Sequence, residues 1–159
     1  MGKIFYQGSI YASAGGIASG AEGVGAIPRD YQRARYHFLR IARIIWPRDT
    51  PSAQPMTVKQ EHREDGTLAY AAASAGYLGR MYLRGEGVKQ DFALAKMWFD
   101  RGAEYKDKEC FNGLGIMWRD GLIDGKKDMK KAVQYFGIAA NQELAEAQVN
   151  LGKYYYREF

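Results

Sequence analysis

A block of five residues that recurs every 36 or 37 residues limits the fold of this chain more than any other feature. LGRMY at 78–82 returns as LGIMW at 114–118 and as LGKYY at 151–155, and QGSIY at 7–11 is a weaker copy. Self-similarity at such a period is the signature of a repeat architecture, in which each unit packs mainly on its neighbours. We therefore expect the 159 residues to form a single solenoid domain.

A second block follows each copy, and it predicts a second helix in every unit. It contains an Asp, an Ala four residues later, an aromatic residue eight residues later and an Ala twelve residues later, all on one helix face. Its copies are Asp30, Ala34, His37-Phe38 and Ala42; Asp91, Ala95, Trp98-Phe99 and Ala103; and Asp128, Ala132, Tyr135-Phe136 and Ala140. The Asp can accept hydrogen bonds from unpaired amides at a helix start. Each unit is thus predicted to be a helix pair, and the fold all-α.

Glycine recurs within the predicted first helices, at Gly8, Gly79, Gly115 and Gly152. A glycine inside a helix costs about 1 kcal/mol relative to alanine. Its repeated presence therefore predicts places where two helices approach too closely for a side chain. The alanines of the second block would allow the same approach from the other helix.

The units are placed at about 3–46, 67–103 and 104–141, with a half unit at 142–159. Two insertions interrupt the period, at about 14–28 and 46–66. The second holds three of the four prolines, so we expect a mobile surface loop from Trp46 to Asp65. Insertions in solenoids often carry partner specificity, and a tolerated spacer is an equally open interpretation.

The chain stops inside a unit, and its last predicted helix is rich in aromatic residues. Tyr154, Tyr155, Tyr156 and Phe159 would form an exposed edge. An exposed apolar patch implies a partner. We expect that the sequence is a piece of a longer solenoid, or that another chain covers this edge, a second copy included.

Composition excludes several kinds of chemistry. One Cys and two His rule out an internal disulfide and a structural zinc site. His37 and His62 do not form a metalloprotease motif, and the loop from Gly121 to Lys126 lacks the spacing of a phosphate loop. The uncharged run 4–21 is too rich in Gly, Ser and Ala for a membrane-spanning helix. We expect no catalytic residue, cofactor, metal or small-molecule substrate.

The cysteine and the histidines have structural interpretations. Cys110 takes the repeat position of Ser74 and Ala147, so we expect a buried thiol that packs like a small residue. His37 takes an aromatic position of the second block and is expected to pack as well. His62 lies among charges in the inserted loop, where we expect it to be solvated.

A basic stripe lies on the helix predicted at 29–48. At 100° per residue its members fall within an arc of about 80°, and they are Arg29, Arg33, Tyr36, Arg40 and Arg43. The opposite, predicted core face carries Tyr31, Ala34, Phe38, Ile41 and Ile45. Arginines beside an aromatic suit phosphates or acidic segments. A net charge of +5 is only a mild basic excess, so we favour a solvated face, then an acidic protein partner, and nucleic acid last.

The repeat segments LGRMYLRGEGVKQDFALAKMWFDRGAEY and LGIMWRDGLIDGKKDMKKAVQYFGIAANQELAEAQVNLGKYYY resemble SEL-one-like repeats, relatives of the tetratricopeptide repeat. The resemblance covers about 68–159 strongly and 4–43 weakly. It implies a right-handed α-solenoid of antiparallel helix pairs, with about three and a half units here. It also implies a scaffold for protein complexes and not a catalyst.

Within that family, the segment PRDYQRARYHFLRIARIIWP and the insertion after it are most similar to the luminal adaptor subunits of HRD-type ubiquitin ligases, in their fungal form. This similarity implies a role in degradation of misfolded proteins at the endoplasmic reticulum, in its lumen. The implied partners are a ligase subunit, a lectin-type recognition factor and misfolded substrates. Repeat proteins that regulate cell-wall synthases or signalling share the consensus, so another pathway and a cytoplasmic location stay open.

The family resemblance also implies where partners bind. In such solenoids a concave groove is lined by first-helix residues outside the consensus. In this chain those residues are Tyr77, Arg80, Arg84, Ile116, Arg119, Asp120, Lys153 and Arg157. We expect a basic groove with an aromatic residue at one end.

Overall fold

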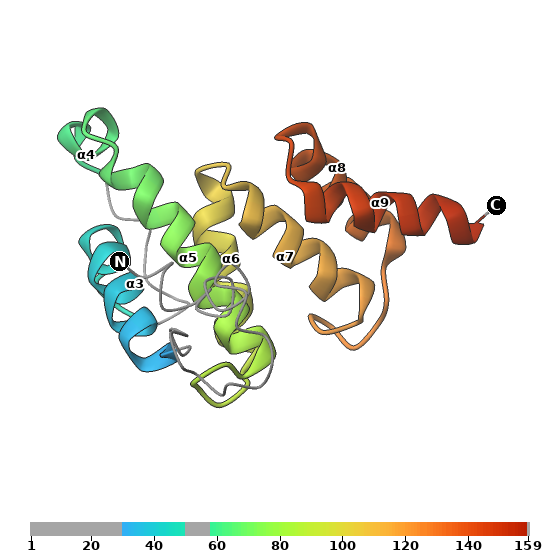
Figure 1. Ribbon diagram of the computed structural model, residues 1–159, viewed down its shortest axis with the longest axis horizontal. Coiled ribbons are helices and arrows are strands. Elements are labelled where there is room, and N and C mark those ends of the chain that lie inside the picture. The colour runs from blue at the N-terminus through green and yellow to red at the C-terminus, as the bar shows by residue number, and fades with distance from the viewer. Residues whose placement is uncertain (1–29, 50–57, 159) are drawn as a thin grey trace, which may run out of the picture.

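The computed structural model describes residues 30–49 and 58–158, and these contain seven helices and no strand. The helices are α3 (Tyr31–Ile45), α4 (Gln60–Glu64), α5 (Thr67–Arg84), α6 (Phe92–Glu104), α7 (Lys108–Arg119), α8 (Met129–Asn141) and α9 (Ala145–Glu158). They follow one another across the molecule from α3 at one side to α9 at the other (Figure 1). The predicted all-α solenoid is confirmed.

Each long helix packs on the next one in the chain. α5 pairs with α6 and α7 pairs with α8, and the short connections make these pairs antiparallel. α6 and α8 also lie against the first helix of the following unit, and α5 touches α7 directly. Contacts between successive units therefore hold the fold together, as expected for a solenoid.

Aspartates begin the helices where the sequence predicts them. The carboxylates of Asp30, Asp91 and Asp128 accept hydrogen bonds from backbone amides three residues later, at 3.0 to 3.1 Å. Asp107 caps α7 in the same way, accepting from the amide of Cys110 at 3.1 Å. Each cap satisfies an amide that has no partner within its own helix.

Two glycines of the first helices allow close contacts between helices. A β-carbon at Gly79 would lie 2.5 Å from the Phe99 ring, and one at Gly115 would lie 2.6 Å from the Phe136 ring. The predicted close approach is confirmed at both positions. It is wrong for Gly152, where a β-carbon would meet nothing within 4 Å, because no second helix packs on that face of α9 in the described residues. Gly8 lies outside the described residues.

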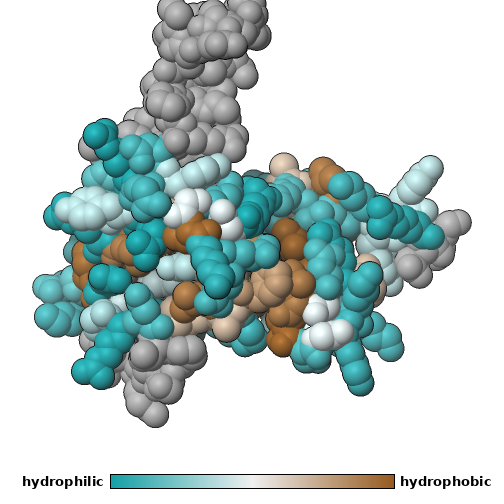
Figure 2. Space-filling view, turned by 90° about the horizontal axis from the view of Figure 1, so that it is seen from below, coloured by the Kyte–Doolittle hydropathy of each residue, from teal (hydrophilic) through white to brown (hydrophobic). Residues whose placement is uncertain are grey.

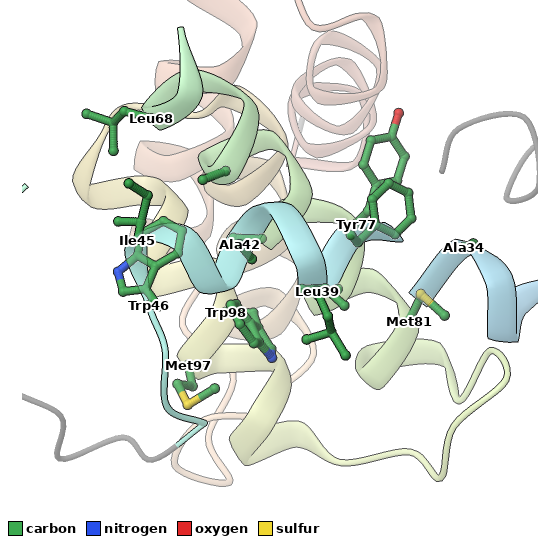
Figure 3. Packing of buried hydrophobic residues seen from close by; sticks show 14 residues of the cluster. Ala34, Leu39, Ala42, Ile45, Trp46, Leu68, Tyr77, Met81, Met97 and Trp98 are labelled. Atoms are coloured by element: carbon green, nitrogen blue, oxygen red, sulfur yellow. The ribbon is translucent and has the colours of Figure 1, made fainter. Parts of the chain in front are cut away.

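A buried cluster joins α3, α5 and α6 (Figure 3). On α3 it contains Ala34, Phe38 and Ile45, as predicted, but the predicted core residue Ile41 is 37% exposed. Leu39 is buried instead, and Ala42 is buried as its place in the second block predicts. The core face of α3 is rotated from the prediction, and Leu39 belongs to the same buried cluster as Met97 and Trp98 of α6.

The inserted segment begins later than the sequence predicts. Trp46 is only 9% exposed, and its ring meets that of Trp98 edge-on with centroids 6.4 Å apart. Arg101 donates to the carbonyl of Arg48 at 2.7 Å, which ties the following residues to α6. Trp46 therefore belongs to the core and not to a surface loop. The helix α4 lies within the rest of the predicted loop, whereas 50–57 and the first insertion, 14–28, lie outside the described residues.

Candidate partner-binding groove

The predicted groove residues fall into three places. Tyr77 is separated from the others, since it is 8% exposed and stacks on Phe38 with centroids 4.7 Å apart and ring planes 2° apart. In the next unit Gly113 takes the position of Tyr77, and there Phe99 lies directly against the glycine. Tyr77 thus packs against the aromatic residue of the preceding second helix, and its ring does not stand free as the groove aromatic.

Arg80, Arg84 and Ile116 come together on one surface of α5 and α7. The guanidinium Nη1 of Arg80 lies 3.9 Å from Glu109 on α7 and 4.0 Å from Glu146 on α9. One arginine thus bridges three successive first helices. This centre is charge-compensated, which corrects the expectation of a uniformly basic groove.

Burial changes the pKa of two carboxyl groups at the start of α7. It raises the pKa of Glu109, and the nearby Glu146 raises it further, while Arg80 acts in the opposite direction. Burial also raises the pKa of Asp107, against the hydrogen bonds that its carboxylate accepts at the start of α7. These carboxylates are charged at neutral pH only at some cost to stability, because burial favours their neutral forms.

The other predicted groove residues surround one cleft of about 350 Å³ between α7, α8 and α9; they are Arg119, Asp120, Lys153 and Arg157. We call it the C-terminal cleft. Its remaining lining consists of Met129, Phe136, Asn150 and Tyr154. Arg119 pairs with Asp120 through two hydrogen bonds of 2.9 and 3.1 Å. Lys153 and Arg157 are exposed on successive turns of α9, so the lining of the cleft carries a positive excess.

Two asparagines position α9 beside the cleft. The Nδ2 of Asn150 donates to the Oδ1 of Asn112 at 3.1 Å, and Asn112 is 3% exposed. A buried polar group needs such a partner. Sequence reasoning missed Asn150, Met129 and Phe136 as cleft residues. Asn150 stands at the repeat position of Tyr77 and Gly113, and a polar side chain at that position was the available signal.

Exposed aromatic residues do occur near the C-terminus. Tyr156 is 87% exposed and Tyr155 is 50% exposed, and the ring of Tyr155 meets that of Tyr154 edge-on with centroids 5.2 Å apart. Tyr154 is only partly exposed because it lines the C-terminal cleft. Phe159 lies outside the described residues. The aromatic edge is therefore continuous with the cleft.

The basic stripe of α3 is exposed, but part of its positive charge is neutralised by ion pairs with aspartates. Arg33 pairs with Asp30 at 3.3 Å, and Arg43 pairs with Asp49 at 3.1 Å. Arg40 lies over the ring of Tyr36, 5.6 Å from its centroid. Arg29 lies outside the described residues. Two of the three described arginines thus have a carboxylate of the same chain beside them.

Cys110 is buried, as predicted from its repeat position. Its Sγ donates to the carbonyl of Ala72 at 3.7 Å, and burial raises the thiol pKa well above its ordinary value, as do Asp107 and Glu109. The thiol therefore stays protonated. His62, expected to be solvated, has a side chain only 22% exposed, with Nδ1 4.0 Å from Asp65.

In 30–49 and 58–158 no group of three or more His, Cys, Asp and Glu side chains is arranged to hold a metal ion. None of the helices in these described residues combines the length and the apolar character that a membrane-spanning helix needs.

Comparison with known proteins identifies the repeats. The family model of the Sel1 repeat matches residues 18–43, 71–104, 112–144 and 145–158. An uncharacterized Sel1-like repeat-containing protein of Schizosaccharomyces pombe is 30% identical over 125 residues, which cover 79% of this chain and 18% of that protein. The ERAD-associated E3 ubiquitin-protein ligase component HRD3B of Arabidopsis thaliana is 31% identical over 129 residues, which cover 68% of this chain and 20% of that protein.

A solved structure also aligns with this chain. The crystal structure of a Sel1 repeat protein from Oxalobacter formigenes aligns with a TM-score of 0.46 and 23% identity, covering 96% of this chain and 63% of that one. The chain spans about a fifth of the length of the two curated relatives.

Proposed function

The chain belongs to the Sel1-repeat family, and from this premise we propose that it is a non-catalytic scaffold that binds a partner protein in the C-terminal cleft. Sel1 repeats indicate a protein–protein interaction scaffold. The observation that carries the proposal is the joining of three of the predicted groove residues, Arg119, Lys153 and Arg157, around one cleft.

The lining of the cleft suits a particular kind of partner segment. Lys153 and Arg157 offer charged donors to a carboxylate, and charge-assisted hydrogen bonds are the stronger ones. Met129 and Tyr154, both partly exposed, offer an apolar surface in the same cleft as these cations. Aromatic and arginine residues that meet in a pocket are the common anchors of protein interfaces. A peptide with an acidic side chain next to an apolar one matches both parts.

We further propose that the complex is the HRD-type ubiquitin ligase of endoplasmic-reticulum-associated degradation. The similarity to HRD3B supports this proposal, as do the resemblance of the segment at 28–47 and the inserted loop after it. The partners would then be a ligase subunit, a lectin-type recognition factor and misfolded proteins, in the lumen of the endoplasmic reticulum.

Affinity purification from the source organism tests both the scaffold proposal and the degradation proposal. The tagged chain should recover ligase components, and Lys153→Glu with Arg157→Glu should reduce that recovery at least tenfold. The matched control reverses two exposed lysines away from the cleft, Lys59→Glu with Lys89→Glu, and should leave recovery unchanged.

The possible results distinguish the degradation proposal from the scaffold proposal. Recovery of cell-wall synthases or signalling proteins without any ligase component would overturn the degradation proposal and leave the scaffold proposal standing. Equal loss of partners in both double variants would overturn the assignment of the cleft.

Nucleic-acid binding through the stripe of α3 is a weaker alternative. The carboxylates of Asp30 and Asp49 beside Arg33 and Arg43 would repel phosphates. Binding to an oligonucleotide with a steep dependence on salt concentration would favour this function over the scaffold.

A further inference from the structure

A second concavity, of about 440 Å³, lies beside α6 and apart from the C-terminal cleft. Phe92, Ala93 and Met97 of α6 form one side of it, and Leu122 and Ile123 of the turn between α7 and α8 form the other. We call it the α6 pocket. Figure 1 shows this turn at the lower edge of the molecule, and Figure 2 looks at that edge, where apolar side chains emerge as separate patches on a largely polar surface.

The preceding unit contains an equivalent turn, between α5 and α6. The two turns begin at Gly85 and Gly121, which both have a positive φ, of 68° and 71°. The residue after each glycine donates its amide to a methionine carbonyl of the first helix, at 2.9 Å in both turns. The second turn is one residue longer, 121–128 against 85–91. Because the turns start in the same geometry, their first residues can be compared one by one.

In the turn between α5 and α6, polar contacts and a glycine close the gap to α3. Tyr31 donates its hydroxyl to Glu86 at 3.1 Å, and Gln32 donates to the carbonyl of Gly87 at 2.7 Å. Gly87 packs so closely on Tyr31 that a β-carbon there would overlap the tyrosine side chain. This turn is thus fastened directly to the second helix of the preceding unit.

The turn between α7 and α8 lacks these closing groups. It has Leu122 and Ile123 where the other turn has Glu and Gly, and α6 has Phe92 and Ala93 where α3 has Tyr and Gln. None of these four side chains carries a hydrogen-bonding group, and the side chain of Ile123 occupies the position at which a glycine allowed close packing. An open apolar pocket therefore stands where the preceding unit has a closed junction.

The turn that forms the pocket also carries positive charge. Lys126 and Lys127 are exposed and follow Ile123 by three and four residues, so their α-carbons lie within about 15 Å of it. Within the described residues neither lysine forms an ion pair. The carboxylate of Asp124 accepts a hydrogen bond from the backbone amide of Lys126 at 2.9 Å. Residues 119–131 hold five basic and three acidic residues, so this part of the surface has a positive excess.

We propose that the α6 pocket binds an acidic, amphipathic segment of a partner protein. An apolar side chain of the segment lies between α6 and the turn, and its carboxylates lie beside Lys126 and Lys127, since complementary charge selects the partner. This surface is separate from the C-terminal cleft, and the proposal does not depend on what binds there.

Like charge disfavours a second copy of this chain as the occupant. The exposed apolar residues of α3 lie beside Arg40, and those of α9 lie beside Lys153 and Arg157. Either helix would bring cations toward the lysines of the turn, and such juxtaposed like charges suppress binding. The partner is therefore a different protein.

A phosphate-bearing surface suits the pocket less well than a peptide does. Asp100 and Asp124 have exposed carboxylates beside it, although Asp100 pairs with Lys96 at 2.6 Å. Regularly spaced phosphates would approach these aspartates as well as the lysines. A flexible peptide can place each of its carboxylates at a lysine and avoid the aspartates.

Subtractive selection from a displayed library of random peptides tests the proposal on the whole chain. Peptides retained by the unaltered chain are passed over the variant Ala93→Glu, and those that bind both are discarded. Ala93 is exposed near the start of α6, where a glutamate is compatible with the helix, and its carboxylate would stand in the pocket. The surviving peptides should combine an apolar residue with two or more acidic residues.

Fluorescence polarisation with a labelled surviving peptide measures the dissociation constant. Ala93→Glu should raise it about tenfold or more, and Lys126→Glu with Lys127→Glu about fivefold or more. The matched control for the first variant is Ala145→Glu, at the exposed first residue of α9. The control for the second is Lys106→Glu with Lys108→Glu, two exposed lysines at the other end of α7. Both controls should leave the dissociation constant within about twofold.

Several results would overturn the proposal. A selection that leaves no peptide, or only peptides without acidic residues, would reject an acidic partner segment. Equal weakening by a variant and its control would reject the pocket, and a loss of binding in Lys153→Glu with Arg157→Glu would move the peptide to the C-terminal cleft. Sedimentation that shows a dimer of the unaltered chain, weakened by Ala93→Glu, would make a second copy the occupant.

Discussion

The ring of Phe99 lies so close to Gly79 that a β-carbon there would stand 2.5 Å from it, and the same ring packs against Gly113 on the next first helix. One second-helix aromatic therefore joins two consecutive units through two glycines. Phe99 is fully buried, so the contact belongs to the core of the solenoid.

Gly79→Ala should destabilise the protein, because the new methyl group must displace a fully buried ring. Overpacking of this kind costs about 1–3 kcal/mol. Urea denaturation monitored by circular dichroism gives the free energy of unfolding. Gly152→Ala is the matched control, since the same methyl group meets nothing there, and it should stabilise α9 by up to about 1 kcal/mol. Similar effects of both changes would contradict the account of the repeated glycine.

Trp46→Ala should destabilise the protein by about 3–5 kcal/mol, the usual loss for a large buried aromatic residue. The indole packs against Trp98 and Tyr105. Pro47→Ala changes the exposed next residue and should alter the unfolding free energy by about 0.5 kcal/mol or less. If Trp46→Ala were as mild as Pro47→Ala, the residue would belong to a surface loop after all.

Glu109→Gln should show how burial of the Glu109 carboxyl group beside Arg80 affects the pH dependence of stability. Burial raises the pKa of Glu109 in the folded protein. At a pH between the unfolded and the folded pKa, the folded state therefore holds a proton that the unfolded state has released. Wild-type stability relative to Glu109→Gln should therefore increase as the pH falls from 7 through the folded pKa toward the ordinary carboxyl range. Urea denaturation at a series of pH values measures this difference. A decrease toward acid would mean that the attraction of Arg80 outweighs burial.

Cys110 should react at least a hundredfold more slowly with a thiol reagent in the folded protein than in urea. Its side chain is buried, and the raised pKa keeps the thiol protonated. The release of a coloured thiolate from a disulfide reagent measures the rate. Cys110→Ala should retain the helical spectrum, because Ala147 fills the same repeat position. Fast labelling of the folded chain would show that this part of α7 opens readily.

The residues that share the surface around Arg80 were predictable from the repeat, but the charge of that surface was not. Arg80, Arg84 and Ile116 meet on one surface because they occupy corresponding or neighbouring turns of successive first helices. The pairing of Arg80 with Glu146 was not visible in the sequence, since 66 residues separate the two. That contact depends on how far each unit turns relative to the last, which no spacing within one unit encodes.

The sequence by itself determined the repeat period, the aspartates that begin the second helices and the close helix approaches at Gly79 and Gly115. These features depend on intervals of three to twelve residues within one helix or on recurrence between units, and both are written in the chain. Only the tertiary structure decided that Tyr77 is buried in a stack, that Trp46 belongs to the core and that Gly152 faces open space. Each of those outcomes is set by which neighbouring helix covers a residue, and coverage follows from the packing of units on one another.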